Sequence, residues 1–278
     1  MSMIENIHYA SLGRVARLIE SREILPDELT RQILDRIDTL DHSLNSYATV
    51  MAESALESAT NAEREILAGN YRGSLHGVPI AVKDLCYTKG VRTMGGLASR
   101  ADFVPTYDAT VVTRLQRAGA VLLGKLNLTE GAFGGYHHDF TIPKNPWNPN
   151  WWSGASSSGS GVATAAGLCY ASLGSDTGGS IRFPSLANGI VGLKPTYGRV
   201  SRHGVLALAD SLDHVGPMTR RTADAAIMLE AIAGFDEQEP SSLRNPVPDM
   251  SSELAKGVDG MKIGYDRRYA TESVDSQL

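Results

Sequence analysis

Residues Ser153 to Pro195 read SGASSSGSGVATAAGLCYASLGSDTGGSIRFPSLANGIVGLKP, and this segment decides the fold. A run of serine and glycine can act as a flexible linker. Here the run leads instead into an alanine-rich helical stretch, an apolar strand, a second glycine-glycine-serine turn and another apolar strand. The glycines are therefore expected to be positional, because glycine permits positive φ and close backbone approach. We interpret the segment as part of a folded core.

The sequence on both sides of this segment alternates helix and strand signals. Apolar residues recur at helical spacing in residues 26–40, 51–67, 109–118 and 222–233. Short apolar runs bounded by turn residues predict strands at residues 78–82, 121–123, 170–173, 190–193 and 261–265. This alternation predicts an α/β fold whose sheet is covered by helices on both faces.

Length and charge exclude several classes of protein. The 278 residues suit one large or two ordinary domains, which is enough to bury a sizeable core. The formal net charge is −5, from 26 basic and 31 acidic residues, and no basic tract is present. The sequence therefore predicts neither nucleic acid nor an anionic membrane surface as the main partner.

The cysteines and the N-terminus bear on the compartment. Cys86 and Cys169 form neither a disulfide framework nor a metal-ligand spacing. The first residues lack the positive charge and apolar run of a signal peptide, and the weakly polar run 161–174 is too short to cross a bilayer. We expect a cytoplasmic protein without a membrane segment.

Residues 236–259, with three prolines and many charges, are expected to form an exposed connection.

Common nucleotide and serine-hydrolase motifs do not fit. The pattern G-x-S-x-G is absent around Ser156 and Ser180, and no P-loop occurs. The dinucleotide fingerprint fails because Thr164 stands where its third glycine should be. His203 and His214 lie nearest the serine segment, but the spacing selects neither as a catalytic base, and a surface or hydrogen-bonded histidine is the plainer interpretation.

Six motifs in chain order resemble the amidase signature family. They are GVPIAVKD at 77–84, GKLN at 124–127 with Glu130, NPW at 145–147, GASSSGSG at 154–161, GSDTGGSIRFP at 174–184 and GLKPT at 192–196. The resemblance implies an amidase signature fold, a mixed twisted sheet with helices on both faces. It also implies that residues 1–278 are only the N-terminal part of that domain, because the family pattern continues beyond Leu278.

The resemblance further implies a serine hydrolase with a Ser–cis-Ser–Lys triad. Ser180 would be the nucleophile, Ser156 the serine that follows a cis peptide bond, and Lys83 the base. The separation of the two serines, 180 − 156 = 24, is the one that the family motif predicts. A lysine can take a proton only when it is neutral, which requires burial or cationic neighbours. Lys83 follows the apolar run VPIAV, which suits this role.

The same resemblance assigns supporting residues around Ser180. The backbone amides expected to form the oxyanion hole are those of Thr177, Gly178, Gly179 and Ser180. Asp176 and Arg182 flank this turn and are expected to brace it as an ion pair. The carbonyl of Ala132 would lie beside the substrate. Neither a metal nor another cofactor is needed for such a reaction.

The identity of the substrate stays open at this level. The implied reaction cleaves an acyl C–N bond of a small-molecule amide, with aryl amides and carbamates (urethanes) as candidate classes. Several aromatic and histidine side chains could line the approach of the substrate to the site. The alternative is that they are ordinary core and surface residues. They are Phe133, Tyr136, His137, His138, Trp151 and Trp152. Where the common pattern has paired glycines, this chain has small residues around Ser156.

Two other functions compete with the amidohydrolase. One is the amidase subunit of a tRNA-dependent amidotransferase, which produces ammonia from glutamine for a partner. The other is a catalytically idle scaffold fragment, which the presence of Lys83, Ser156 and Ser180 disfavours. In each case we expect the remainder of the polypeptide or a partner chain to complete the fold, because a partial domain leaves apolar faces uncovered. A homo-oligomer is a further alternative.

Overall fold

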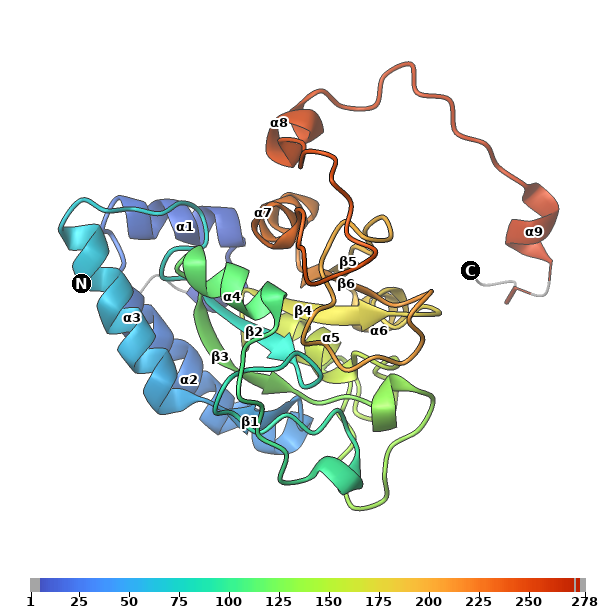
Figure 1. Ribbon diagram of the computed structural model, residues 1–278, viewed down its shortest axis with the longest axis horizontal. Helices are drawn as coiled ribbons and strands as arrows, with labels where there is room; N and C mark the ends of the chain where they lie inside the picture. Colours follow the sequence, from blue (N-terminus) through green and yellow to red (C-terminus); the bar gives the residue numbers. More distant parts are fainter. Residues whose placement is uncertain (1–5, 273, 276–278) are drawn as a thin grey trace.

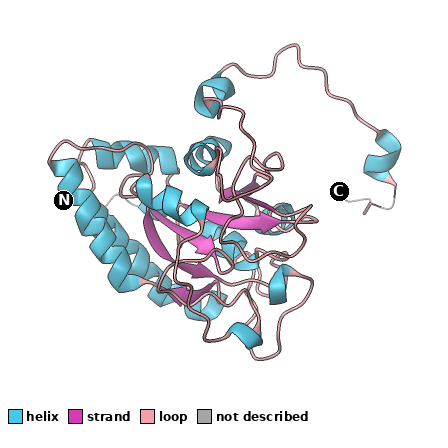
Figure 2. Ribbon diagram, in the orientation of Figure 1, coloured by secondary structure: helices cyan, strands magenta, loops and turns pink. Residues whose placement is uncertain are grey.

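A computed structural model describes residues 6–272 and 274–275. Its centre is a six-stranded mixed sheet with the order β1-β3-β2-β4-β6-β5 (Figures 1 and 2). The strands are β1 (Tyr47–Val50), β2 (Pro79–Lys83), β3 (Val121–Leu126), β4 (Ala171–Asp176), β5 (Val191–Gly192) and β6 (His214–Thr219). The α/β fold class expected from the sequence is confirmed.

Three parallel strands in the middle of the sheet position the candidate site. Strand β2 pairs in parallel with β3 on one side and with β4 on the other, and Val82 lies opposite Leu173. Strands β1, β5 and β6 are antiparallel to their neighbours. Since parallel strands end at the same edge, Lys83 at the end of β2 lies close to Ser175 near the end of β4.

Helices pack against this sheet along its length (Figure 1). Helix α3 contacts β3, α5 contacts β4, and α7 contacts β6. The longer helices are α1 (Leu12–Glu20), α2 (Pro26–Leu44), α3 (Ala52–Leu67), α4 (Thr110–Arg117), α5 (Ser158–Ala165), α6 (Arg182–Asn188) and α7 (Thr222–Ile232). The short ones are η1 (Ile7–Tyr9), η2 (Ala98–Arg100), η3 (Glu130–Ala132), α8 (Met250–Ala255) and α9 (Arg267–Thr271).

Most of the expected elements are confirmed. All four expected helices are present, and α2 continues beyond residue 40 to Leu44, where Asn45 stops it with φ of 56°. Four of the expected strands correspond to β2, β3, β4 and β5. Strand β6 was not expected, because its sequence HVGPMT contains Pro217, a residue that usually disfavours strands. Pro217 contributes its carbonyl to the ladder, which accepts the amide of Leu193 at 3.0 Å.

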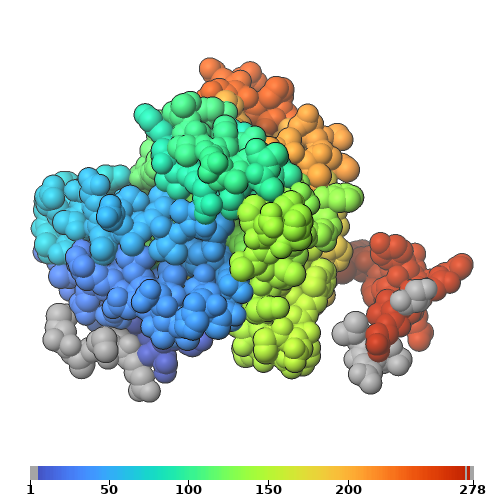
Figure 3. All heavy atoms as spheres, turned by 90° about the horizontal axis from the view of Figure 1, so that it is seen from below, coloured from blue at the N-terminus to red at the C-terminus, as the bar shows by residue number. Residues whose placement is uncertain are grey.

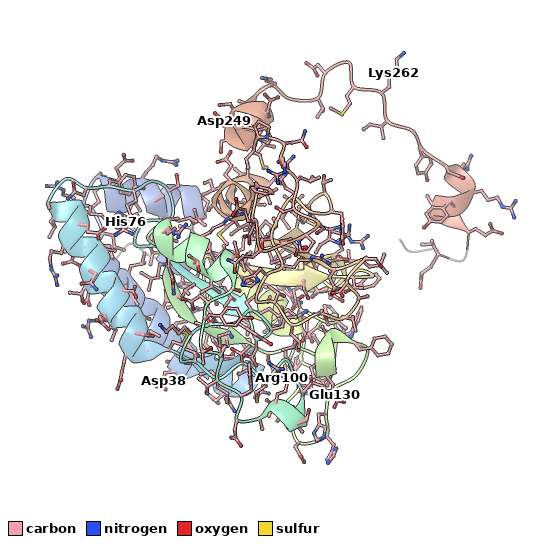
Figure 4. All side chains as sticks on the ribbon, viewed as in Figure 1. Asp38, His76, Arg100, Glu130, Asp249 and Lys262 are labelled. Carbon is pink, nitrogen blue, oxygen red and sulfur yellow. The ribbon has the colours of Figure 1, made fainter. Side chains whose placement is uncertain are left out.

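The strand expected at residues 261–265 is wrong. This segment is irregular, and Ile263 is 82% exposed. Figure 1 shows it leaving the folded body on its way to α9, and the side chain of Lys262 points away from the body in Figure 4. A strand needs a neighbouring backbone to pair its amides and carbonyls, and no strand of the described chain pairs with this segment.

The expected connection at residues 236–259 contains more structure than its composition indicates. Glu239 is buried and forms an ion pair of 2.9 Å with Arg202. Helix α8 lies against α7, where the Ser251 amide donates to Glu230 Oε1 at 2.8 Å. In the described part of the chain, none of the helices combines the length and apolar character that crossing a membrane requires.

Candidate active site

Lys83 is the centre of a buried cluster of hydroxyl groups. It is the last residue of β2, and its side chain is fully buried. Its Nζ donates to Ser156 Oγ at 2.7 Å, to Ser157 Oγ at 2.9 Å and to Ser175 Oγ at 2.8 Å. The resemblance grouped Lys83 with Ser156, and the fold brings these two side chains into contact and adds two hydroxyl partners, Ser157 and Ser175.

The environment of Lys83 favours its neutral form. Burial lowers the pKa of Lys83 to about 7, while Cys86, Asp176 and Asp213 act in the opposite direction. Desolvation dominates because an ammonium loses its hydration inside the protein and the three hydroxyls replace it only in part. Near neutral pH, a substantial fraction of Lys83 can therefore accept a proton.

Ser157 has its hydrogen-bonding capacity fully assigned. Its hydroxyl donates to the carbonyl of Ser175 at 3.1 Å and accepts the Ser175 amide at 3.2 Å. The remaining lone pair faces Lys83 Nζ, so toward the lysine Ser157 can act only as a hydrogen-bond acceptor. When Lys83 is neutral, one of its two N–H groups is committed to Ser157. The lysine lone pair can then accept from the hydroxyl of either Ser156 or Ser175, and the second N–H group donates to the other.

Ser156 lies in a turn with restricted backbone geometry. The peptide bond between Ala155 and Ser156 is cis, and the Ser156 carbonyl accepts the amide of Thr129 at 3.3 Å. Gly154 precedes this turn with φ of +82°, and a Cβ there would lie 2.2 Å from Pro184 Cα. Only glycine fits this close backbone approach, which explains the residue at this position.

Ser180 ends a turn that joins β4 to α6. Its side chain is half-buried, and its carbonyl accepts the Ser157 amide at 3.2 Å. This hydrogen bond ties the main chain of Ser180 to the residue that follows Ser156. Two segments 24 residues apart in the sequence, 180 − 156, are thereby held side by side.

Asp176 organises this turn from inside. Its Oδ1 accepts the Gly179 amide at 2.8 Å, and its Oδ2 accepts the Ile181 amide at 3.1 Å. Arg182 donates to both carboxylate oxygens at 3.0 Å. Burial raises the pKa of Asp176, but the hydrogen bonds from Arg182 and the backbone outweigh it, so the pKa lies below its usual value. The carboxylate is ionised and braces the turn.

The arrangement corrects one expectation about the oxyanion hole. The Gly179 amide is occupied by Asp176 and is not free to bind a developing anion. The amides of Thr177, Gly178 and Ser180 have no acceptor within the described residues. Gly179 contributes its conformation instead, with φ of +137°. The sequence could not separate these amides, because all four belong to one motif.

A cavity of about 490 Å³ adjoins the cluster around Lys83. Ala132, Ser175 and Thr177 line one part of it, and the buried Arg202–Glu239 ion pair lies in another. Thr177 Oγ1 donates to Asp213 Oδ1 at 2.5 Å, which links the turn to the cavity wall. Ala132 has φ of +61°, an uncommon backbone conformation for a residue with a Cβ.

The aromatic and histidine residues considered as pocket residues do not line this cavity. Phe133, Trp151 and Trp152 are 76%, 63% and 61% exposed. They belong to the surface around residues 130–155, which Figure 3 shows in yellow-green beside the blue N-terminal helices. The cavity is lined instead mainly by residues between Tyr197 and Val215, together with residues 239–241.

Two other clusters of ionisable groups are distinct from Lys83. Lys125 Nζ is buried and donates to the Cys86 carbonyl at 2.7 Å and to Thr93 Oγ1 at 2.6 Å, with Asp84 Oδ1 at 3.4 Å. These contacts hold neighbouring loops together inside the protein. Metal-ligand atoms within 4.8 Å of one another also occur on an exposed loop of the described chain, at His137, His138 and Asp139.

Comparison with known proteins identifies relatives of this chain. The model of the Amidase family matches residues 28–278. AmiD of Mycobacterium tuberculosis (strain H37Rv), a putative amidase by its name, is 57% identical over 244 residues, which cover 88% of this chain and 51% of AmiD. A glutamyl-tRNA(Gln) amidotransferase subunit from Geobacter sp. (strain M21) is 48% identical, over 94% of this chain and 54% of its own length.

Comparison with solved structures agrees with these sequence matches. Native peptide amidase from Stenotrophomonas maltophilia superposes with a TM-score of 0.85 at 37% identity, over 88% of this chain and 53% of that one. The chain thus spans about half the length of the proteins that it matches. The family model and the relatives agree with the motifs and the fold, and the chain belongs to the Amidase family.

Proposed function

We propose that this chain carries the catalytic residues of a serine amidohydrolase that cleaves an acyl C–N bond through an acyl-enzyme on Ser180. The observation that carries the proposal is the contact of 2.7 Å between Lys83 Nζ and Ser156 Oγ, buried beside a cavity. Lys83 is fully buried with hydroxyl partners in place of a carboxylate, an environment that favours the neutral amine that a proton acceptor requires. Membership of the Amidase family supports the same chemistry.

In the proposed mechanism, Ser180 Oγ attacks the carbonyl carbon of the substrate. Its proton passes to Ser156, whose own proton passes to neutral Lys83. The carbonyl oxygen becomes an anion, for which the amides of Thr177, Gly178 and Ser180 are the proposed donors. The C–N bond then breaks, and the amine leaves with the proton returned from Lys83 through Ser156.

Water completes the proposed cycle. It attacks the acyl carbon, and its proton follows the same route to Lys83. The bond between Ser180 Oγ and the acyl carbon breaks, the acid leaves, and the proton returns to Ser180. The Ala132 carbonyl is proposed to contact the substrate, since Ala132 lines the cavity. Lys83, Ser156 and Ser180 carry each proton transfer, so the proposal invokes neither a metal nor another cofactor.

The substrate class is proposed more broadly than a single compound. Aryl amides and carbamates (urethanes) present the same acyl C–N bond, and the cavity of about 490 Å³ suits a small molecule.

We further propose that additional polypeptide, as a continuation or a partner chain, covers apolar side chains such as Ile263 and Leu186, which are 82% and 81% exposed. Cys86 and Cys169 are buried free thiols, which supports the proposed cytoplasmic location.

Labelling with a fluorophosphonate tests the nucleophile. We expect folded protein to be labelled at Ser180 and the Ser180→Ala variant to remain unlabelled, as peptide mapping would show. Absence of labelling in folded protein would contradict the enzyme proposal and favour an idle scaffold. A panel of anilides, aliphatic amides, carbamates and glutamine then ranks the substrates.

A second candidate is the amidase component of a tRNA-dependent amidotransferase. The 48% identity to the amidotransferase subunit from Geobacter favours it. Glutamine hydrolysis that requires the addition of partner subunits would support this function over the independent amidohydrolase. Turnover of an anilide or carbamate without partners would support the first candidate.

A further inference from the structure

The loop from Thr129 to Tyr136 holds the turn around Ser156 at both of its ends. At the first end, the Thr129 amide donates to the Ser156 carbonyl at 3.3 Å. At the second end, Tyr136 Oη donates to Ser158 Oγ at 2.6 Å. Ala132 lies between these two anchors and lines the cavity. The loop therefore connects the cavity wall to the turn that carries the cis peptide bond.

Internal hydrogen bonds close the loop but do not fix its second half to the body. The Glu130 amide donates to the Gly135 carbonyl at 2.7 Å, and Thr129 Oγ1 donates to the Phe133 carbonyl at 2.7 Å. A Cβ at Gly134 or Gly135 would meet no atom within 4 Å, so this half of the loop is open to its surroundings. Figure 4 labels Glu130, which opens η3 at this edge of the molecule.

Ala132 needs an external restraint. Its φ of +61° is unfavourable for a residue with a Cβ and persists only where the surroundings impose it. The Gly131 amide, which donates to the Gly95 carbonyl at 2.9 Å, restrains the residue before it. After Ala132, the first side chain that joins the loop to a buried group of α5 is Tyr136.

The hydrogen bond between Tyr136 and Ser158 is well suited to this restraint. Ser158 is fully buried at the start of α5, and Tyr136 is half-buried. Burial raises the pKa of Tyr136, although hydrogen bonds with Ser158 and Ser153 act in the opposite direction, so the phenol keeps its proton at neutral pH. Loss of the phenol hydroxyl would leave a buried serine hydroxyl without this partner.

We propose that Tyr136 is a positioning residue that holds the main chain of Ala132 against the substrate cavity through its hydrogen bond to Ser158. This inference rests on the proposed function, since it gives a purpose to the position of the Ala132 carbonyl. Tyr136 does not line the cavity and acts through the loop. Its removal should weaken ligand binding without slowing the chemical step on Ser180.

The test compares three variants of the intact protein with a matched control. Tyr136→Phe removes only the phenol oxygen, Ser158→Ala removes its partner, and the double variant removes both. Tyr107→Phe is the control, because Tyr107 packs against Tyr87 and His203 and its hydroxyl makes no hydrogen bond within the described residues. Hydrogen exchange of residues 129–136 reports the loop. The inactivation kinetics of an alkyl fluorophosphonate give its binding constant, KI, and its maximal rate, kinact.

We expect Tyr136→Phe to speed exchange in the loop and to raise KI about fivefold, with kinact within twofold of the parent. The double variant should recover thermal stability relative to Ser158→Ala or Tyr136→Phe, because no buried hydroxyl is left unpaired, yet KI should stay raised. If the hydrogen bond were purely structural, the double variant would restore thermal stability and KI together.

Unchanged exchange in Tyr136→Phe would overturn the inference, and so would faster exchange with an unchanged KI. A fall in kinact at constant KI would also contradict it, since that result assigns Tyr136 to the chemical step. If the parent protein is not labelled at all, the proposed function fails. The exchange data still decide in that case whether Tyr136 restrains the loop.

Discussion

Ser157 accepts a hydrogen bond from Lys83 Nζ at 2.9 Å and has no remaining capacity to donate one back, because its proton goes to the Ser175 carbonyl. The relationship fixes the direction of one lysine N–H group in both protonation states. Two serines that are adjacent in the sequence therefore differ in chemistry. Ser156 can exchange a proton with Lys83, whereas Ser157 can only orient it.

Substitution of Ser157 by alanine tests this difference. We expect kcat/KM to fall about tenfold, because the lysine loses one of its orienting acceptors and the Ser175 amide loses a partner. Ser156→Ala should cost about 100-fold or more, since it interrupts the proton path. Steady-state kinetics on the best substrate of the panel give both values.

Ser160→Ala is the matched control for Ser157→Ala. Ser160 is buried like Ser157 and lies in α5, and its hydroxyl donates to the Leu173 carbonyl at 2.9 Å without contact to Lys83. It should lose stability but little kcat/KM. Equal kinetic losses in Ser157→Ala and Ser160→Ala would remove the orienting role.

The pH dependence of activity should report Lys83. Burial lowers the pKa of Lys83 to about 7, and only the neutral amine can accept a proton. The rate constant kcat/KM is therefore expected to be low below pH 6, to rise through pH 7 and to level off above pH 8. Measurement of kcat/KM from pH 5 to 9 checks this. A profile that falls across this range would contradict neutral lysine as the base.

Replacement of Lys83 by methionine should abolish most of the turnover. Methionine fills a similar volume without a nitrogen, so the fold is expected to persist while general base catalysis is lost, a loss of about 100- to 10,000-fold in kcat. Circular dichroism verifies folding. Lys256→Met provides a control, because that lysine is exposed at the end of α8 and, within the described residues, its only ion pair is with Glu253. A loss of less than tenfold in Lys83→Met would remove the lysine from the mechanism.

The sequence predicted what its local motifs encode. Helical periodicity located α2, α3, α4 and α7, and the resemblance led to Lys83 and Ser156, which the fold brings to 2.7 Å. Ser175 was missed as a lysine partner, since its contact spans 92 residues and depends on the parallel pairing of β2 with β4. The strand expected at 261–265 failed for a related reason, because a strand forms only where a partner is present.

Ala132 and Thr177 were expected at the site and line the cavity, but most of its other lining residues were not predicted. The aromatic side chains near Trp151 drew attention because of their chemistry, but they lie on the surface. Contact between the turn at Thr177 and the segment at Asp213 arises from the antiparallel pairing of β4 with β6. Strand β6 itself was not predicted, since it contains Pro217. Long-range register therefore limits prediction of the site more than the chemistry of single residues does.

Asp176 should contribute more to stability than its partner Arg182. Asp176→Ala removes the acceptor of the Gly179 and Ile181 amides inside the protein, and we expect a loss of ~3 kcal/mol. Arg182→Met should cost ~1 kcal/mol, because the guanidinium is 54% exposed and the amides still hold the carboxylate. Urea denaturation at pH 7 gives both values.

The contribution of Asp176 should also depend on pH. Its pKa in the folded protein lies below the ordinary value of 3.8, since the hydrogen bonds from Arg182 and the backbone exceed the effect of burial. Its stabilisation is therefore complete above the unfolded pKa and is lost as the pH falls through the folded pKa. The difference in unfolding free energy between parent and Asp176→Ala should shrink below pH 4. A difference that grows on acidification would reverse the assigned sign.

Gly179 is expected to tolerate no side chain, in contrast to the glycine before it. Its φ of +137° belongs to a region that is nearly exclusive to glycine, and a Cβ would lie 2.2 Å from Phe183 Cε2. Gly179→Ala should therefore lose ~2 kcal/mol of unfolding free energy. Gly178→Ala, where a Cβ would meet no atom within 4 Å, should lose less than ~1 kcal/mol. The double variant Gly179→Ala/Phe183→Leu separates the two causes. If the backbone conformation dominates, the smaller side chain at position 183 will recover little of the loss in urea denaturation, whereas full recovery would show that the clash with the ring alone excludes a side chain.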